Sequence, residues 1–222
     1  MSATLEAVSK AKAHTTYRLA DGTRVAGTTT VLAVLAKPAL VKWANQIGLQ
    51  GVEVGKYVDA LADIGTLAHA LITHDLGGPA PDLAAYSPEA IDKAENAFIK
   101  YLDWRKQHNV EPVFVERPLV SEKFRYGGTL DVYAHIDGAP AIIDIKTSKR
   151  IYSEHIHQVA AYRQLAVENG FDVDHVRILQ VGRTDDEGFT ERVVSLAELR
   201  RHWQIFRCCL TIYRLQTELK EE

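Results

Sequence analysis

Cysteine and long hydrophobic runs are both scarce in this sequence. Its 222 residues include only two cysteines, Cys208 and Cys209, which are adjacent in a segment with helical spacing. Adjacent positions on a helix suit a disulfide poorly, and two thiolates are too few for a structural zinc or an iron–sulfur cluster, so we expect reduced thiols in the core. No segment approaches the roughly 20 apolar residues that cross a bilayer, and the first residues contain no apolar run of the signal-peptide kind. We therefore expect a soluble, cytoplasmic protein without a membrane partner.

A strong net charge is also missing. The formal charge of −3 excludes a surface coated with basic residues but is compatible with a local cationic site. Between Arg117 and Arg163 the chain has seven Lys or Arg and five Asp or Glu residues. Two metal-bound carboxylates would leave this region clearly cationic, while a solvated surface of mixed charge accounts for the excess equally well. The sequence has no Gly-x-x-x-x-Gly-Lys-Ser/Thr loop, so translocation along a duplex would need a partner.

The first half of the chain has helical spacing. A short hairpin is expected around Asp21-Gly22, followed by a helix over residues 31–48 that is interrupted near Pro38. Further helices are expected over about 57–76 and about 87–108, with a break in the glycine- and proline-rich stretch 77–81 between them.

The second half changes to strand spacing. Three strands are expected over residues 113–120, 126–136 and 140–146, with Asp137-Gly138 as the turn between the last two. Ser153 is expected to cap a helix that ends at Asn169-Gly170, and a second hairpin should connect 175–182 with 189–195. Ser195 and Glu198 form a capping-box pattern before a last helix over about 196–219. We therefore predict an α/β (α+β) fold in one domain: a helical part over about 28–108 and a mixed sheet flanked by helices over about 112–222.

The predicted hairpin brings two aspartates together. If Asp137 and Gly138 are the central residues of a two-residue turn, each cross-strand pair has residue numbers that sum to 275, which places Asp131 opposite Asp144. Opposed side chains lie about 4.5–5.5 Å apart at Cβ, where two like charges destabilise a sheet. A divalent cation held between the carboxylates would offset this repulsion.

Lys146 adds a cationic side chain to the two aspartates. Residues two apart on a strand share a face, so Lys146 should point the same way as Asp144, with Ile143 and Ile145 facing the opposite layer. A metal can activate water and a lysine can stabilise charge on a phosphate, so the group suits a phosphodiester hydrolase. The alternative is an acidic hairpin with a surface salt bridge from Asp144 to Lys146. The apolar neighbours of both aspartates favour the catalytic interpretation.

Four short motifs follow one another along the chain: Gly65-Thr66-x-x-His69, Gly128-x-x-Asp131, Asp144-x-Lys146-Thr147 and Gln158-x-x-x-Tyr162. Upstream of them stand Thr28-Thr29-Thr30-Val31-Leu32 and Leu40-x-x-Trp43. Together they resemble the RecB-like exonuclease branch of the PD-(D/E)xK nuclease superfamily, including its phage and mitochondrial members. A proline-serine pair often precedes the threonine run in that branch, and Ala26-Gly27 stands there in this chain. The resemblance implies a restriction-endonuclease-like core.

The resemblance also implies metal ligands and a catalytic lysine. His69, Asp131, Asp144 and the carbonyl of Ile145 would bind Mg²⁺ or Mn²⁺, and Lys146 would act in catalysis. Without the other motifs, His69 would more often be a core or surface histidine.

Three further residues have two interpretations each. Gln158 and Tyr162 lie four apart on one helical face, so they could contact a phosphate or the Lys146 strand in catalysis, or form the polar edge of an amphipathic helix. Glu116 could stand beside the site, or pair with Arg117 on the surface.

The function indicated is a Mg²⁺- or Mn²⁺-dependent deoxyribonuclease, an exonuclease acting on DNA ends with a preference for single strands, by analogy with the branch. Lys149 and Arg150 follow the catalytic strand directly and are the expected DNA-binding residues. A structure-specific endonuclease and a non-cleaving DNA-binding or assembly module are the alternatives. We expect a role in DNA repair or recombination in a bacterial or phage-infected cell, with a recombination or replication protein as partner.

Overall fold

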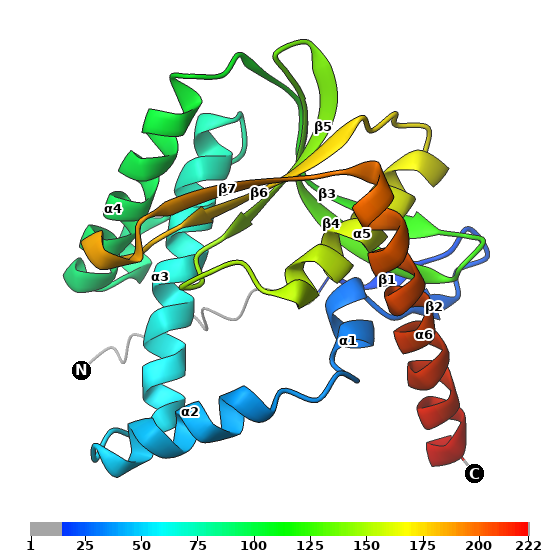
Figure 1. Cartoon of the computed structure of the whole chain (residues 1–222), viewed down its shortest axis with the longest axis horizontal. Helices are drawn as coiled ribbons and strands as arrows, with labels where there is room; N and C mark the ends of the chain where they lie inside the picture. The colour runs from blue at the N-terminus through cyan, green and yellow to red at the C-terminus, as the bar shows by residue number, and fades with distance from the viewer. Residues whose placement is uncertain (1–14, 222) are drawn as a thin grey trace, which may run out of the picture.

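A five-stranded mixed sheet with helices on both faces forms the body of the protein in a computed structural model, which describes residues 15–221 (Figure 1). The strand order is β3-β4-β5-β6-β7. β5 and β6 are parallel and the other neighbours are antiparallel. The mixed α/β sheet predicted from the order of elements is confirmed. The strands are β3 (Val110–Ser121), β4 (Tyr126–Ile136), β5 (Ala139–Lys146), β6 (His175–Val181) and β7 (Phe189–Val194).

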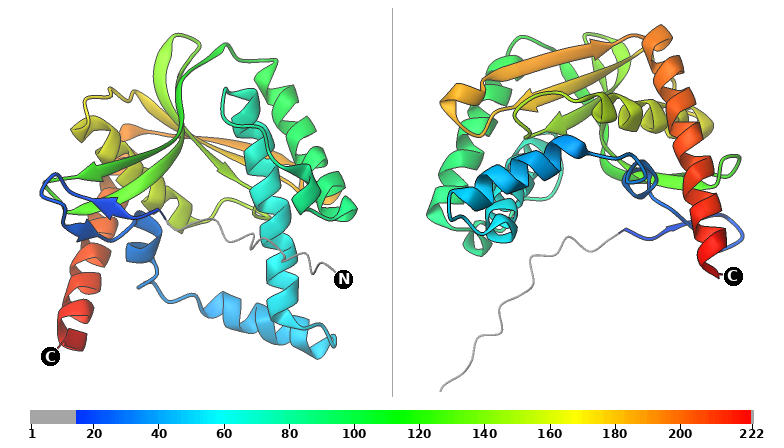
Figure 2. Two further views of the ribbon diagram at one scale, coloured as in Figure 1. Left: turned by 180° about the vertical axis from the view of Figure 1, so that it is seen from behind. Right: turned by 60° about the horizontal axis from the view of Figure 1, so that its bottom comes forward.

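Both faces of the sheet are buried because successive apolar side chains enter opposite layers. Ile142 belongs to a core formed with α5 (Ser153–Glu168) and α6 (Leu196–Glu221). Ile143 belongs to a second core formed with α3 (Val54–Asp75) and α4 (Pro88–Arg105). Figure 2 shows the two helix pairs on opposite sides of the sheet.

The remaining elements lie before α3 or in connections. A small hairpin of β1 (Tyr17–Arg18) and β2 (Arg24–Val25) leads into α1 (Thr28–Leu32) and α2 (Pro38–Leu49). Proline at the first position of α2 confirms the predicted interruption, because its missing N–H is not needed there. In Figure 1, α2 runs from near α1 to the far end of α3, and none of its residues is buried. Two short 3₁₀ turns, Leu83–Ala85 and Asp185–Glu187, complete the fold.

Serine caps two of the helices, and the cap predicted at Ser195 forms while the one predicted at Ser153 does not. Ser87 Oγ accepts from the backbone N of Ala90, and Ser195 Oγ accepts from the backbone N of Glu198. Ser153 was the wrong residue for the cap of α5, since it is already the first helical residue. His155 Nδ1 instead accepts from the backbone N of Tyr152, so a side chain at the third helical position satisfies the free amide before the helix.

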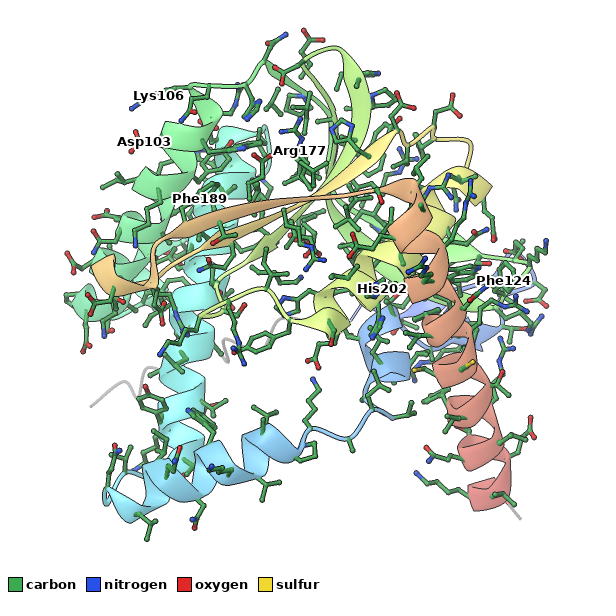
Figure 3. The ribbon with its side chains drawn as sticks, viewed as in Figure 1. Asp103, Lys106, Phe124, Arg177, Phe189 and His202 are labelled. Carbon is green, nitrogen blue, oxygen red and sulfur yellow. The ribbon has the colours of Figure 1, made fainter. Side chains whose placement is uncertain are left out.

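Helix α6 closes one side of the sheet with aromatic contacts. Phe124, which is labelled in Figure 3, lies on the turn between β3 and β4. Its ring meets that of Trp203 of α6 with centroids 5.0 Å apart. Cys209 is buried in this layer but Cys208 is exposed, so the expectation that both thiols lie in the core was wrong for Cys208. Neighbouring residues point about 100° apart around a helix, and only one of the two can face the sheet. None of the helices in residues 15–221 combines the length and hydrophobicity needed to cross a membrane.

Candidate active site

The candidate site begins at the turn between β4 and β5. Asp137 and Gly138 have φ values of 52° and 86°, as a two-residue type I′ turn requires. The pairing that follows starts at Ile136 with Ala139 and keeps the predicted register, with residue numbers that sum to 275 along its length.

The two strands diverge where the aspartates stand. The last ladder pair is Val132 with Ile143, so Asp131 and Asp144 occupy the next step, beyond the regular pairing. There the backbone N–H of Ile145 donates to Asp131 Oδ2 at 2.9 Å, so a carboxylate accepts a hydrogen bond from the strand. We call this divergence of β4 and β5 beyond Val132 and Ile143 the fork. It allows two acidic side chains to lie close together at the end of a paired hairpin.

Asp144 is fully buried, with an exposed fraction of 0%. Its Oδ2 lies 2.7 Å from Lys146 Nζ, but neither carboxylate oxygen has a hydrogen-bond partner of good geometry among the described residues. Burial raises the pKa of Asp144, and Asp131 raises it further against the opposing effect of Lys146. Burial alone would lower the pKa of Lys146, but Asp144 and Asp131 together raise it, so Lys146 stays an ammonium.

Asp131 faces His69 from the other side of the fork. His69 Nε2 lies 3.2 Å from Asp131 Oδ2, and His69 Nδ1 lies 3.1 Å from Glu116 Oε1. Burial works to raise the pKa of Asp131, but His69, Lys146 and the Ile145 amide outweigh it and hold this pKa below its usual value. His69 of α3 therefore lies beside Glu116 of β3 and Asp131 of β4, close to the aspartate with which the sequence motifs grouped it.

Glu116 reaches the site through an irregular backbone. Residues Val115 and Arg117 pair with β4, while Glu116 between them has a φ of 50°, in the left-handed region that costs a side-chain-bearing residue energy. Its carboxylate thus belongs to the site rather than to a surface pair with Arg117. Strand periodicity could not have decided between these interpretations, because the position departs from regular strand geometry.

These side chains fit a divalent cation. His69, Glu116 and Asp131 each offer a ligand atom, and the three atoms lie within 4.8 Å of one another. One imidazole with carboxylates suits Mn²⁺ and is compatible with Mg²⁺. The buried Asp144 carboxylate, which within residues 15–221 is paired only with Lys146 through Oδ2, adds an anionic group that a cation would stabilise.

Two motif glycines allow other elements to approach the strands. A Cβ on Gly128 would lie 2.7 Å from Tyr162, 2.8 Å from Thr28 and 3.0 Å from Leu165. A Cβ on Gly65 in α3 would lie 2.6 Å from Oγ1 of Thr147, just after β5. Glycine at these positions lets α5, α1 and α3 pack close to the fork.

Gln158 and Tyr162 lie in α5 beside the site. Gln158 Nε2 donates to the hydroxyl of Tyr162 at 2.7 Å. Burial raises the pKa of Tyr162, and the charges of Asp131 and Asp144 raise it further, so its hydroxyl keeps its proton. Both residues line a cavity of about 690 Å³ together with Glu116 and Asp131.

A second cavity, of about 720 Å³, lies next to the first. Lys146, Lys37 and His155 line it, and it shares Thr29 and Gln158 with the first cavity. The acidic cluster therefore borders one cavity and the lysine borders the other. The basic residue Arg24 lines the first cavity; neither Arg24 nor Lys37 was expected from the motifs.

The predicted DNA-binding residues lie elsewhere. Lys149 and Arg150 are exposed after β5 and line neither of these cavities. Arg150 lies over the ring of Tyr152, 5.1 Å from its centroid. Their role in DNA binding stays a prediction, as does that of the Ile145 carbonyl in metal binding.

No protein-family model and no curated protein matches this chain. Among solved structures, one described as "Crystal structure of SSO0001" aligns with 55% of this chain at 15% sequence identity and a TM-score of 0.28. The chain spans 61% of that protein. A similarity this low carries no conclusion about fold or function.

Proposed function

We propose that this protein is a metal-dependent deoxyribonuclease with a restriction-endonuclease-like core, and that it degrades single-stranded DNA from an end. The observation that carries the proposal is the fork of β4 and β5. It holds Asp131 and Asp144 beside Lys146, and among residues 15–221 the fully buried Asp144 carboxylate has no partner of its own beyond the ion pair of its Oδ2 with Lys146. A structural salt bridge alone does not account for this arrangement, because it leaves Oδ1 of a buried carboxylate unsatisfied, and buried polar atoms normally have a hydrogen-bond partner.

The residues divide the chemistry between them. A divalent cation bound by His69, Glu116 and Asp131, with Asp144 beside it, would supply an activated water and a counter-charge for phosphate. Lys146 lies 2.7 Å from Asp144 and stays protonated, so its ammonium is available to stabilise charge that develops on a phosphate oxygen.

The α5 residues serve positioning. Tyr162 keeps its hydroxyl proton and receives a hydrogen bond from Gln158, so its O–H is held in a fixed direction at the wall of the first cavity. A fixed donor beside the acidic cluster suits the orientation of a phosphate next to the metal ligands.

The two adjoining cavities support a preference for single strands. One is bordered by the acidic cluster and the other by Lys146, and Thr29 and Gln158 line both. A strand passing from one to the other would place one phosphate between the cation ligands and the ammonium.

End-labelled DNA tests this proposal directly. We expect linear single-stranded DNA to be shortened in Mg²⁺ or Mn²⁺, with no cleavage in EDTA and none by Asp131→Asn. A closed circular single strand should survive; its cleavage would favour the structure-specific endonuclease. RNA and duplex of the same sequence define the substrate class. No cleavage of any of these substrates in either metal would leave only a DNA-binding or assembly module and contradict the proposal.

A further inference from the structure

Helix α6 has a second apolar stripe that faces away from the protein. Its inner side chains, Phe206, Cys209, Leu210 and Tyr213, pack on the core that contains α5. The exposed apolar or thiol side chains are Ile205, Cys208, Ile212, Leu215 and Leu219. With about 100° between successive residues, the centres of the two stripes lie about 130° apart. The C-terminal half of α6 also projects beyond the sheet (Figures 1 and 2).

The spacing of the exposed stripe is that of a coiled-coil seam. Its members alternate at intervals of three and four residues from 205 to 219, the repeat of the a and d positions of a heptad. A helix that packs only on its own domain needs one such stripe, and α6 already has it on the inner side. The exposed fractions are large for a helix of this kind: 45% at Ile212, 53% at Leu215 and 71% at Leu219.

We propose that α6 pairs in parallel with α6 of a second copy of this chain, along the seam Ile205, Cys208, Ile212, Leu215 and Leu219. The identity of the residues indicates this occupant. Isoleucine occupies two a positions, Ile205 and Ile212, and leucine occupies the d position Leu215, a combination that favours two parallel strands.

The charges along the helix agree with self-pairing. In a parallel pair with twofold symmetry each residue meets its own copy, so a charged seam would repel itself. From Ile205 to Leu219 the seam has no charged side chain, and its flanking positions Gln204, Thr211 and Gln216 are uncharged. Glu218 flanks the seam only at its last turn, and Arg201 marks its other end. An uncharged seam also does not suit nucleic acid, which binds cationic surfaces.

Short isolated helices pair weakly because helix formation itself is costly. Here the inner stripe of α6 already holds the helix in the folded protein, so that cost does not oppose association. A seam of two heptads buries a small area compared with the roughly 1,200–2,000 Å² that a standard interface buries. We therefore expect the dimer to dissociate on dilution. The dimer does not depend on the proposed nuclease activity.

Sedimentation velocity over a wide range of concentrations tests the pairing. We expect a shift from the 24.7 kDa chain toward twice that mass as concentration rises. Ile212→Glu with Leu215→Glu should abolish the shift, and so should Leu219→Glu alone, which changes a side chain that is 71% exposed and is not needed for folding. The matched control is Val41→Glu with Leu49→Glu, which places the same charges on exposed apolar residues of α2 and should leave the shift intact.

Cys208 reports the direction of pairing. Only in the parallel arrangement does Cys208 face its own copy, where diamide would accept two electrons and two protons from the thiols as the disulfide forms. We expect a cross-linked dimer that Cys208→Ser removes and Cys209→Ser retains. A protein that stays monomeric at every concentration, a dimer that survives the seam substitutions, or a dimer that fails to cross-link through Cys208 would each overturn the proposal.

Discussion

At the residue scale, the surroundings of Lys146 give the clearest indication of a chemical role. Its ammonium lies 2.7 Å from Asp144, and the raised pKa keeps it charged although burial opposes this. A lysine that only binds DNA does not need an ion pair with a fully buried carboxylate such as Asp144. The position suits a group that acts on one phosphate at the site.

Replacing Lys146 by alanine should therefore reduce turnover far more than affinity. A group that stabilises charge in the transition state typically contributes about 10²–10³ in rate, while binding is spread over other cationic residues. Single-turnover cleavage at saturating DNA, beside a binding titration, measures the two effects separately. A melting curve must accompany them, because the variant leaves Asp144 without its partner. Near-parental cleavage by a folded Lys146→Ala protein would make the lysine a phosphate anchor only.

Asp144→Asn should separate folding from catalysis. The buried carboxylate has a raised pKa, first because of burial and then because of Asp131, so in metal-free buffer its negative charge destabilises the folded state. Lys146 keeps the attraction of Asp131 when Asp144 is neutral. We expect thermal stability in EDTA to be equal or higher, and cleavage in Mg²⁺ to fall by orders of magnitude. A clear loss of stability in EDTA would show that the ion pair with Lys146 outweighs burial.

His155 should make stability sensitive to mild acid. Burial, and then the charge of Lys146, lower its pKa from the usual 6.5 to about 4. The unfolded chain therefore binds a proton at higher pH than the folded protein does. The stabilisation is fully present above the unfolded value of about 6.5 and is lost as the pH falls toward about 4.

Thermal melts in EDTA between these pH values provide the measurement. His155→Gln should have a shallower decline in stability than the parent. Some decline should persist, because burial also lowers the pKa of His157, His175 and His202. Equal slopes in parent and variant would show that His155 does not contribute.

At the scale of elements, the hairpin that carries Asp131 and Asp144 was predictable because its short turn determines the register of the two strands. Asp137-Gly138 sets the register, which places Asp131 and Asp144 at the step directly after the last regular pair, Val132 with Ile143. Glu116 was not assigned, because the pairing of β3 with β4 shifts register between Pro112 and Phe114 and Glu116 itself has a left-handed backbone, so simple alternation along the strand does not determine where its side chain lies. The cap of α5 was misassigned because His155 supplies an acceptor that the preference for serine does not anticipate.

The contact of α3 with the end of β5 provides a test of how closely the elements must approach. Gly65→Ala gains about 1 kcal/mol of helix propensity, but its Cβ would lie 2.6 Å from Thr147 Oγ1. We expect little net change in melting temperature and a marked loss of cleavage, because the displaced helix carries His69. Adding Thr147→Ala removes the obstructing hydroxyl and should restore activity. If the double variant is as inactive as Gly65→Ala, the close approach is not the reason for the glycine.

At the scale of the whole molecule, the surroundings of the site could not be derived from the sequence. The first cavity is lined by residues as far apart in the chain as Tyr17 and Tyr213, from the N-terminal hairpin and from α6. Tyr17 reaches the sheet through a 2.9 Å hydrogen bond between its hydroxyl and Thr129 Oγ1. No local pattern contains such contacts, which depend on how the helices and the hairpin pack around the fork.

Two pairs of cationic residues are candidates for binding the DNA backbone. Arg24 lines the first cavity and Lys37 the second, whereas Lys149 and Arg150 follow β5 outside both. If DNA passes through the cavities, Arg24→Ala with Lys37→Ala should weaken binding of single-stranded DNA more than Lys149→Ala with Arg150→Ala. Each lost phosphate contact should also reduce the slope of log affinity against log salt by about 0.7.

Titrations of a labelled oligonucleotide at several salt concentrations, in EDTA to prevent cleavage, measure both quantities. Lys37 lies 2.6 Å from Glu154, so part of its charge is already compensated. Glu154→Gln should therefore tighten binding if Lys37 contacts a phosphate, because the ammonium is then free to do so. If the Lys149 and Arg150 variant loses more affinity and more salt dependence than the Arg24 and Lys37 variant, DNA runs along the loop after β5, and the cavities hold no more than the strand end at the site.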